Sequence, residues 1–385
     1  FSEFKYERPD FNLYKEKMIS LIDQFKVAKN AEEQLKVVSE INEIRNHIET
    51  MATLASIRHS IDTRDTFYDA EQNYWDEYSP LYEEVTSLFY DAIISSPYRK
   101  ELEEKLSKQF FTILEYRLKA FSPDIISDLQ EENKLSSQYT KLIASAKILF
   151  DGEERTLPGM GKYLLSENRQ VREEASKAKY AFFEEHESEI DEIYDQLVKV
   201  RTRIAKKLGF NNFVELGYVR MTRSDYTPEM VENFRKQVLE YIVPVASSLY
   251  ERQERRLGYK MLRYFDEKFE FTTGNATPKG DPEWILDNGV KMYHELSPQT
   301  KEFFDFMVGN ELLDLVNKPG KAGGGYCTYI PDYKAPFIFS NFNGTAGDID
   351  VLTHEAGHAF QVYSSRWIEI PELNFPTYES CEIHS

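Results

Sequence analysis

Apolar residues recur at helical spacing through most of the chain. One apolar face of an amphipathic helix is marked near the start by Tyr14, Met18, Leu21, Ile22 and Phe25. The same period runs through residues 35–70 and 82–94, and no strand pattern interrupts residues 11–121. The first third of the chain is therefore predicted to be helical.

Proline and serine set the expected limits of these helices. Pro80 predicts a break or a kink, and a turn at 95–97 should precede a helix over 98–120. Ser122 followed by Pro123 resembles a helix N-cap, so the next helix should run to about Leu149.

Further helices are predicted on the C-terminal side of residue 161. They cover 166–208, 228–265 with an interruption at Pro244, and 282–316. Between them and the first helices, residues 151–161 (DGEERTLPGMG) contain three Gly and a Pro, which indicates a loop or a short hairpin. We place a domain boundary there, with an N-terminal helical domain over 1–150 and a second domain over 151–385.

Residues 317–348 have a different pattern. Short runs of aromatic and β-branched residues at 326–330 and 337–342 predict two strands of a small sheet. The preceding glycines at 323–325 match no phosphate-binding motif, so they are interpreted as a hinge or a strand entry. An exposed edge of this sheet could pair with an extended peptide through backbone hydrogen bonds.

The segment VLTHEAGHAFQ, at 351–361, carries the clearest chemical pattern. His354 and His358 are four residues apart, so on a helix their imidazoles share one face and can bind one metal ion. With seven His in the chain, chance would give the H-E-x-x-H pattern only about 0.02 times. The motif therefore predicts a zinc site.

Glu355 follows the first of these histidines directly. Its carboxylate can take a proton from the water that attacks a peptide bond, so it is the candidate general base. The similar pair His294 and Glu295 has Pro298 where the second histidine would stand, and we interpret it as surface helix.

Sequence spacing does not decide which residue is the third metal ligand or which residues bond to the ligating histidines. Asp348 could cap the metal helix. Asp350 could orient His354, although a capping or solvated role is favoured for it. Gln361 and Ser364 stand where the metzincin motif requires Gly and His, which excludes that class. The third ligand must come from further on, where Glu379 and Glu382 are both candidates.

Charge and cysteine content narrow the possible partners. The net charge of −19 opposes binding to nucleic acid or to an anionic membrane. Two cysteines are too few for a disulfide framework, and the start of the chain has no signal-peptide pattern. No run of 18 apolar residues is present. A soluble cytoplasmic protein is therefore expected.

Taken together, these segments resemble the oligoendopeptidase F and thimet oligopeptidase group of zinc metallopeptidases, the M3 peptidases. The resemblance rests on Gly323–Tyr326, the HEAGH motif and Glu382–Ser385, and more loosely on Leu208–Phe213. In that family a glutamate about 24 or 25 residues after the second histidine, with a serine three residues later, is the third ligand. Glu382 lies 24 residues after His358, so the resemblance favours it over Glu379.

The resemblance also implies a fold. We expect a mainly α, zincin-like metallopeptidase with two lobes around a channel and a small β-sheet beside the HExxH helix. The family's substrate-binding Tyr and His residues lie downstream of the third ligand. Residues 151–385 are therefore expected to be the first part of the catalytic domain, with its remainder beyond Ser385.

The function implied is that of a zinc-dependent endopeptidase acting on short, unfolded oligopeptides. One zinc per chain is expected at His354, His358 and Glu382, with Glu355 as the base. The oligomeric state is left open. Two alternatives remain, namely a zinc exopeptidase such as a carboxypeptidase or dipeptidase, and a non-catalytic helical peptide-binding protein with a vestigial zinc site.

Overall fold

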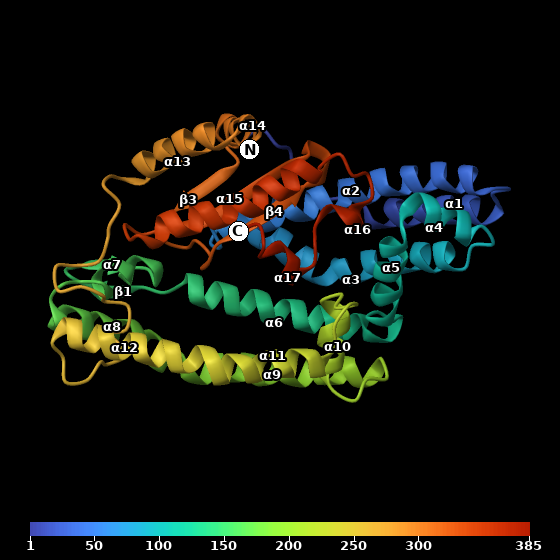
Figure 1. Ribbon diagram of the computed structural model, residues 1–385. Coiled ribbons are helices and arrows are strands. Elements are labelled where there is room, and N and C mark those ends of the chain that lie inside the picture. The colour runs from blue at the N-terminus through green and yellow to red at the C-terminus, as the bar shows by residue number, and fades with distance from the viewer.

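The computed structural model describes residues 1–385, and its mainly helical character confirms the expected fold class. Three long helices pack against one another in the N-terminal part (Figure 1). They are α1 (Phe11–Val27), α2 (Ala31–Ile61) and α3 (Thr66–Ile94). Each begins after a side chain that accepts a hydrogen bond from the first turn, namely Asp10, Asn30 and Asp65.

The break expected at Pro80 is wrong, because α3 runs through this residue without interruption. A proline lacks the N–H that would bond to the carbonyl four residues earlier, which here belongs to Asp76. The Asn133 side-chain amide donates to that carbonyl instead, at 3.0 Å. Its neighbour Gln130 donates to the Glu77 carbonyl at 2.7 Å. Donors from another helix thus replace the missing bond.

Two predicted helices are divided by local capping. The run over 35–70 is interrupted at 62–65, because the Asp65 carboxylate accepts the amides of Phe67 at 2.9 Å and Tyr68 at 3.1 Å and starts a new helix. The run over 98–120 divides at Ser107, whose φ of 82° no α-helix accommodates. The products are α4 (Arg99–Leu106) and α5 (Lys108–Lys119).

The helix after Ser122 begins as expected, with Ser122 as the cap of a short 3₁₀ turn. Its predicted end near Leu149 is wrong, because the helix ends at Ala144 and residues from Ile148 pair as a strand. The hairpin expected near Asp151 also forms, from β1 (Ile148–Phe150) and β2 (Glu153–Arg155). The helices of this part are α6 (Ile126–Ala144), α7 (Gly161–Leu164), α8 (Arg169–Glu185), α9 (Glu187–Lys207) and α10 (Phe213–Arg220). The helical character predicted for residues 166–208 is confirmed, and the segment contains two helices, α8 and α9.

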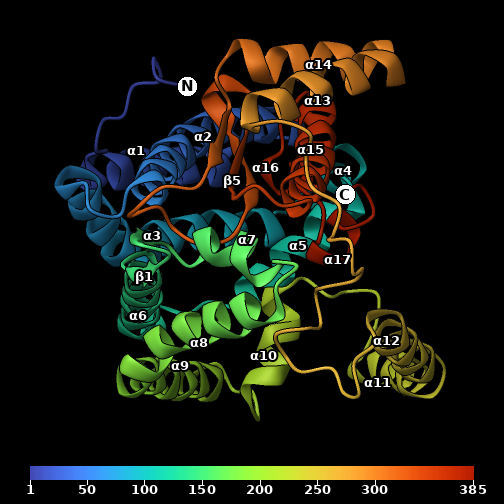
Figure 2. The ribbon, with the colours of Figure 1, turned by 90° about the vertical axis from the view of Figure 1, so that its left-hand side faces the viewer.

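The helical run predicted over 228–265 ends early. It consists of α11 (Pro228–Gln237), a π-helical turn over Val238–Ile242, and α12 (Val243–Leu257). Gly258 then adopts a left-handed conformation with φ of 71° and terminates it. The π-helical turn directly precedes Pro244, where the regular bonding pattern cannot continue. Figure 2 shows α11 and α12 set apart from the other helices.

Next along the chain come α13 (Pro282–Leu296) and α14 (Pro298–Gly309), followed by a three-stranded sheet. Its strands, in the order β3-β5-β4, are β3 (Leu313–Val316), β4 (Tyr326–Ile330) and β5 (Ala335–Phe342). The two predicted strands are confirmed as the antiparallel pair β4 and β5. The helix predicted to reach Val316 is wrong, because a turn with Glu311 at φ of 55° leads into β3, which pairs in parallel with β5.

Helix α15 (Gly347–Ser365) contains the HEAGH motif and packs on β5 and β4. The short helices α16 (Pro371–Asn374) and α17 (Tyr378–Cys381) follow. The largest group of buried apolar residues joins the N-terminal helices to this part of the chain, with members such as Phe89, Phe304, Phe339 and Ala356. One continuous core therefore supports α15, and its residues come both from the N-terminal helices and from the C-terminal part of the chain.

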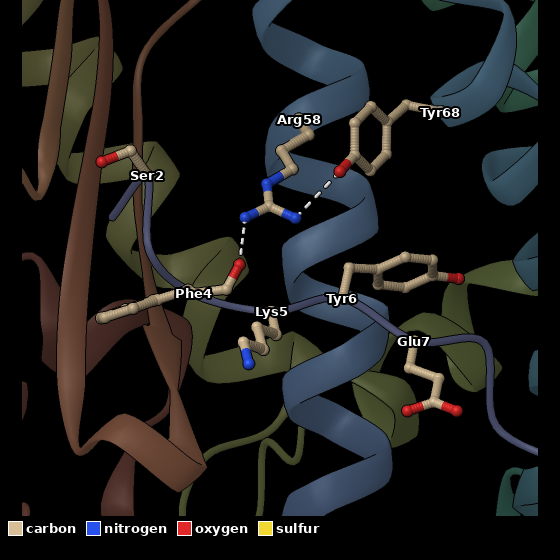
Figure 3. Close-up of a pocket in the computed structure, with 7 residues that line it drawn as sticks. All are labelled: Ser2, Phe4, Lys5, Tyr6, Glu7, Arg58 and Tyr68. Atoms are coloured by element: carbon tan, nitrogen blue, oxygen red, sulfur yellow. Dashed lines mark hydrogen bonds between the residues drawn. The ribbon is translucent and has the colours of Figure 1, made fainter.

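The N-terminal segment also reaches this part of the molecule. Arg58 on α2 donates to the Phe4 carbonyl and, at 2.9 Å, to the Tyr68 hydroxyl (Figure 3). The Phe4 ring stacks on Tyr333, with ring centroids 3.6 Å apart. The pocket in Figure 3 includes none of the predicted metal or catalytic residues; it is lined by Ser2, residues 4–7, Arg58 and Tyr68.

Candidate metal centre

Two imidazoles project from α15 toward one point. The Nε2 atoms of His354 and His358 are 3.2 Å apart, and the two rings are perpendicular at 89°. Two nitrogens bound to one tetrahedral zinc at about 2.05 Å would stand about 3.3 Å apart. The spacing in the structure therefore fits a shared zinc ion, as the four-residue separation on a helix predicts.

A carboxylate completes the group. Glu382 places Oε2 at 3.6 Å from His354 Nε2 and Oε1 at 3.9 Å from His358 Nε2. The three ligand atoms lie within 4.8 Å of one another. Two imidazole nitrogens and one carboxylate oxygen form a donor set typical of catalytic zinc. The structure thus brings together the three residues predicted as ligands.

Glu379, the alternative third ligand, lies elsewhere. Its carboxylate Oε1 accepts a hydrogen bond from Arg223 Nε at 2.7 Å. Its neighbourhood therefore differs from that of Glu382, although the two residues are only three positions apart.

The buried position of His358 favours its neutral form. Burial lowers the pKa of the His358 imidazole, and the neighbouring His354 lowers it further. A metal ligand must be the neutral imidazole, so the local environment already favours the binding state.

Glu355 is buried on α15, with 6% of its surface exposed. Burial raises the pKa of its carboxyl group, and the nearby Glu382 adds to the increase. The carboxylate points toward the start of β4, where Oε1 would lie 3.5 Å from a side-chain carbon placed on Gly325. Gly325 therefore leaves open the space in front of the predicted base.

Asp348 does not cap α15 as predicted, and Asp350 is solvated rather than bonded to His354. Asp348 accepts the backbone amides of Asn343 at 2.9 Å and Gly344 at 2.8 Å, so it stabilises the turn that leads into α15. The residue at the N-cap position is Ala346, which has no capping side chain. Asp350 is exposed and makes no hydrogen bond to His354.

Gly357 has a role that the motif alone does not reveal. A side-chain carbon at this position would meet the His384 carbonyl oxygen at 2.1 Å and the Ser385 Cα at 2.9 Å. Only a residue without a side chain lets the segment that carries Glu382 approach α15 so closely. The glycine between the two histidines therefore gives the third candidate ligand its access.

We expect Gly357→Ala to weaken zinc binding by about 10- to 100-fold, the range typical for losing a residue that orients a ligand. The added methyl group must displace the backbone near His384, which moves Glu382. Zinc content after dialysis measures the effect. Gly309→Ala is the matched control, because a methyl group there meets nothing within 4 Å. Unchanged zinc binding in Gly357→Ala would show that this contact does not position Glu382.

Beside the metal group, β4 forms one edge of the sheet, because only β5 pairs with it. A cavity of about 1010 Å³ extends from residues 327–329 of this strand along α2 and α3 to α16 and α17. Tyr378, which lies four residues before Glu382 in the sequence, is one of the residues that line it. The cavity and the strand edge together offer space for an extended chain.

Charged residues of the N-terminal helices line this cavity, and sequence spacing does not connect them with the metal motif. Arg45 on α2 donates to the Glu372 carboxylate and, at 2.8 Å, to the Tyr90 hydroxyl. The Tyr90 hydroxyl in turn donates to Glu372 at 2.7 Å. Although burial raises the pKa of Glu372, Arg45 and Tyr90 hold it below its usual value. These bonds tie α16 to the N-terminal helices.

Comparison with known proteins adds independent information. A model of the peptidase M3 N-terminal domain matches residues 1–121, and a model of peptidase family M3 matches residues 162–377. No helix in the structure combines the length and apolarity needed to cross a membrane.

Several known proteins align with most of this chain. The chain is 24% identical over 360 residues to an oligoendopeptidase F homologue of Lactococcus lactis, and the alignment covers 86% of this chain and 57% of the relative. It is 21% identical to oligopeptidase PepF of Bacillus subtilis, with coverage of 89% and 53%. The structure of PZ peptidase A with an inhibitor matches with a TM-score of 0.99 and 59% identity, over 100% of this chain and 68% of that one. The chain therefore spans a little over half the length of these curated relatives.

Proposed function

Because the chain belongs to peptidase family M3, whose model matches more than half of it, we propose that the protein is a zinc-dependent endopeptidase. It hydrolyses internal bonds of short, unfolded oligopeptides. The observation that carries this proposal is the convergence of His354, His358 and Glu382 beside the buried Glu355.

In the proposed mechanism, His354, His358 and Glu382 hold one zinc ion. When bound, the ion supplies Lewis acidity that polarises the peptide carbonyl and lowers the pKa of water. Glu355 takes a proton from the attacking water on its carboxylate oxygen and later delivers it to the leaving amine. Burial of Glu355 suits this role, because it raises the pKa of the carboxyl group and so makes the carboxylate a stronger base.

The edge of β4 is proposed to bind the substrate. An extended peptide can add to this edge through backbone hydrogen bonds, which suit many sequences because they do not depend on side chains. The cavity along α2 and α3 has space for the peptide beyond the edge. A folded protein rarely exposes a free extended segment that would fit there, which supports a preference for short, unfolded peptides.

The remaining parts of the proposal concern organisation and location. We propose that residues 1–150 and 151–385 form two lobes around a substrate channel, and that the protein acts in the cytoplasm. The net charge of −19 supports the exclusion of nucleic acid as a partner, because the phosphate backbone would be repelled.

A library of peptides of graded length, blocked at both ends, tests the proposed reaction. The protein should cleave internal bonds of the short members, because the general base and the metal act on the bond that lies over them. Cleavage should stop when a chelator removes zinc and return when zinc is added back. Mass spectrometry of the products measures both the cleaved position and the length limit.

Two outcomes of this experiment contradict the proposal. If blocked peptides stay intact while unblocked versions of the same peptides lose only terminal residues, the protein is an exopeptidase. Stoichiometric zinc and peptide binding without any cleavage would identify a binding protein with a vestigial site.

A further inference from the structure

The segment that carries Glu382 has few connections to the rest of the protein. It contains only the four-residue helix α17, and the Glu382 side chain itself is 58% exposed. Cys381 is buried. The hydroxyl of Ser385 donates to Glu382 within the same segment, at 3.3 Å to Oε2. Such local bonds do not determine where the segment lies relative to α15.

Glu379 joins residues 376–385 to a part of the protein other than α15 through polar contacts with Arg223 and Tyr226. Arg223, which follows α10, donates from Nε to Glu379 Oε1 at 2.7 Å. A second guanidinium nitrogen, Nη2, contacts the same carboxylate oxygen. Glu379 is 156 residues away from Arg223 in the sequence and one helical turn before Glu382. In Figures 1 and 2, α17 lies between α15 and α10.

Arg223 is itself held in place. Its guanidinium carbon lies 4.5 Å from the centre of the Tyr218 ring, and its backbone amide donates to the Tyr218 carbonyl at 3.0 Å. The Tyr116 hydroxyl on α5 donates to the Arg223 carbonyl at 3.3 Å. The helix before it, α10, is anchored by the fully buried Leu216, which packs with Val200 of α9. The position of Arg223 is therefore fixed by its contacts with α5 and α10.

The solvent exposure of the Arg223–Glu379 ion pair indicates whether it stabilises the fold or orients a segment. The side chains of Arg223 and Glu379 are 20% and 40% exposed, so water and salt screen their attraction and the contribution to overall stability is small. An arginine guanidinium nevertheless restricts the orientation of the carboxylate that it binds. The contact is therefore suited to orienting a segment rather than to stabilising the fold.

We propose that Arg223 is a positioning residue for the third metal ligand. Through Glu379 it holds α17 in the orientation that brings Glu382 to the two histidines. Metal affinity then depends on the contact between Arg223, which follows α10, and Glu379 on α17. This inference rests on the ligand set of the proposed function, with Glu382 as a ligand.

The first test is zinc affinity, measured by competition with a chelator on the protein and its variants. Arg223→Ala and Glu379→Gln should each weaken zinc binding by about 10-fold, the lower end of the range for residues that orient a ligand. The double variant should bind zinc no more weakly than Glu379→Gln alone, because Arg223→Ala removes a contact that Glu379→Gln already alters. Arg223→Lys should recover only part of the affinity, since it retains a positive charge near Glu379 but lacks the planar guanidinium that orients the carboxylate.

The control and a second measurement separate positioning from general damage. Arg99→Ala removes an ion pair of similar exposure, with Glu115 at 2.7 Å, and should leave zinc affinity unchanged. Cobalt(II) in place of zinc gives visible absorption that reports ligand number and geometry. The spectrum should change in Arg223→Ala and return toward the original in Arg223→Lys, whereas a uniformly destabilised protein would keep its spectrum while folded.

The outcomes are distinguishable. If the unchanged protein binds zinc but Arg223→Ala and Glu379→Gln stay within twofold of it, this inference is wrong and the proposed function stands. Additive losses in the double variant would also contradict it. If the unchanged protein binds no stoichiometric zinc, the ligand set fails, and both the proposed function and this inference fail with it.

Discussion

Glu355→Gln is expected to retain zinc while peptide hydrolysis falls by at least about 100-fold. Glutamine has nearly the same shape as glutamate but cannot accept a proton from water at neutral pH. Zinc should remain, because Glu355 is not among the three residues whose ligand atoms converge. Zinc content and the initial rate of peptide cleavage, measured on the same preparation, check both parts.

The chain provides a matched control for this substitution. Glu295 also follows a histidine directly on a helix, but it is exposed and distant from the metal motif in sequence. Glu295→Gln should leave both zinc content and rate unchanged. Loss of zinc from Glu355→Gln alone would mean that Glu355 is itself a ligand, which would reverse its assigned role.

The second large effect is expected from Glu382→Ala, which should lose its zinc during dialysis at neutral pH. The variant would keep only the two imidazoles of α15, and a catalytic zinc site normally has three protein ligands. Glu379→Ala should keep its zinc through the same dialysis and show reduced turnover, because it lacks contacts that position α17 but no metal ligand. Zinc per chain after identical dialysis compares the two.

The opposite result would contradict the assignment of Glu382 as the third ligand. If Glu379→Ala is metal-free and Glu382→Ala retains zinc, the third ligand has been assigned one helical turn too late. The structural position of Glu379, bonded to Arg223, makes this outcome unexpected.

The parts of the fold that sequence predicts well depend on local signals. Amphipathic periodicity identifies most helices, and the aromatic runs identify β4 and β5 because strands with such residues pack against a core. The positions of His354 and His358 follow from helix geometry alone. These features are determined by residues within one or two turns of each other, so a short window contains the necessary information.

The parts that sequence misses depend on distant partners. β3 was included in a helix because its four residues form a strand only through parallel pairing with β5, which lies about 25 residues further on. The choice of Glu382 over Glu379 from spacing alone was not possible, because it depends on which side of α17 faces α15. Arg223 shows no signal at all, since neither its neighbours nor its spacing relates it to Glu379.

The bond from Asn133 to the Asp76 carbonyl also has an evolutionary consequence. Pro80 is tolerated in α3 because a side chain of α6 supplies the donor that proline lacks. A lineage that loses Asn133 while keeping Pro80 leaves that carbonyl without its donor, whereas a lineage that first replaces Pro80 restores the helix's own bond and frees position 133 to vary. The order in which these two substitutions are accepted is therefore constrained by the backbone of a single helix.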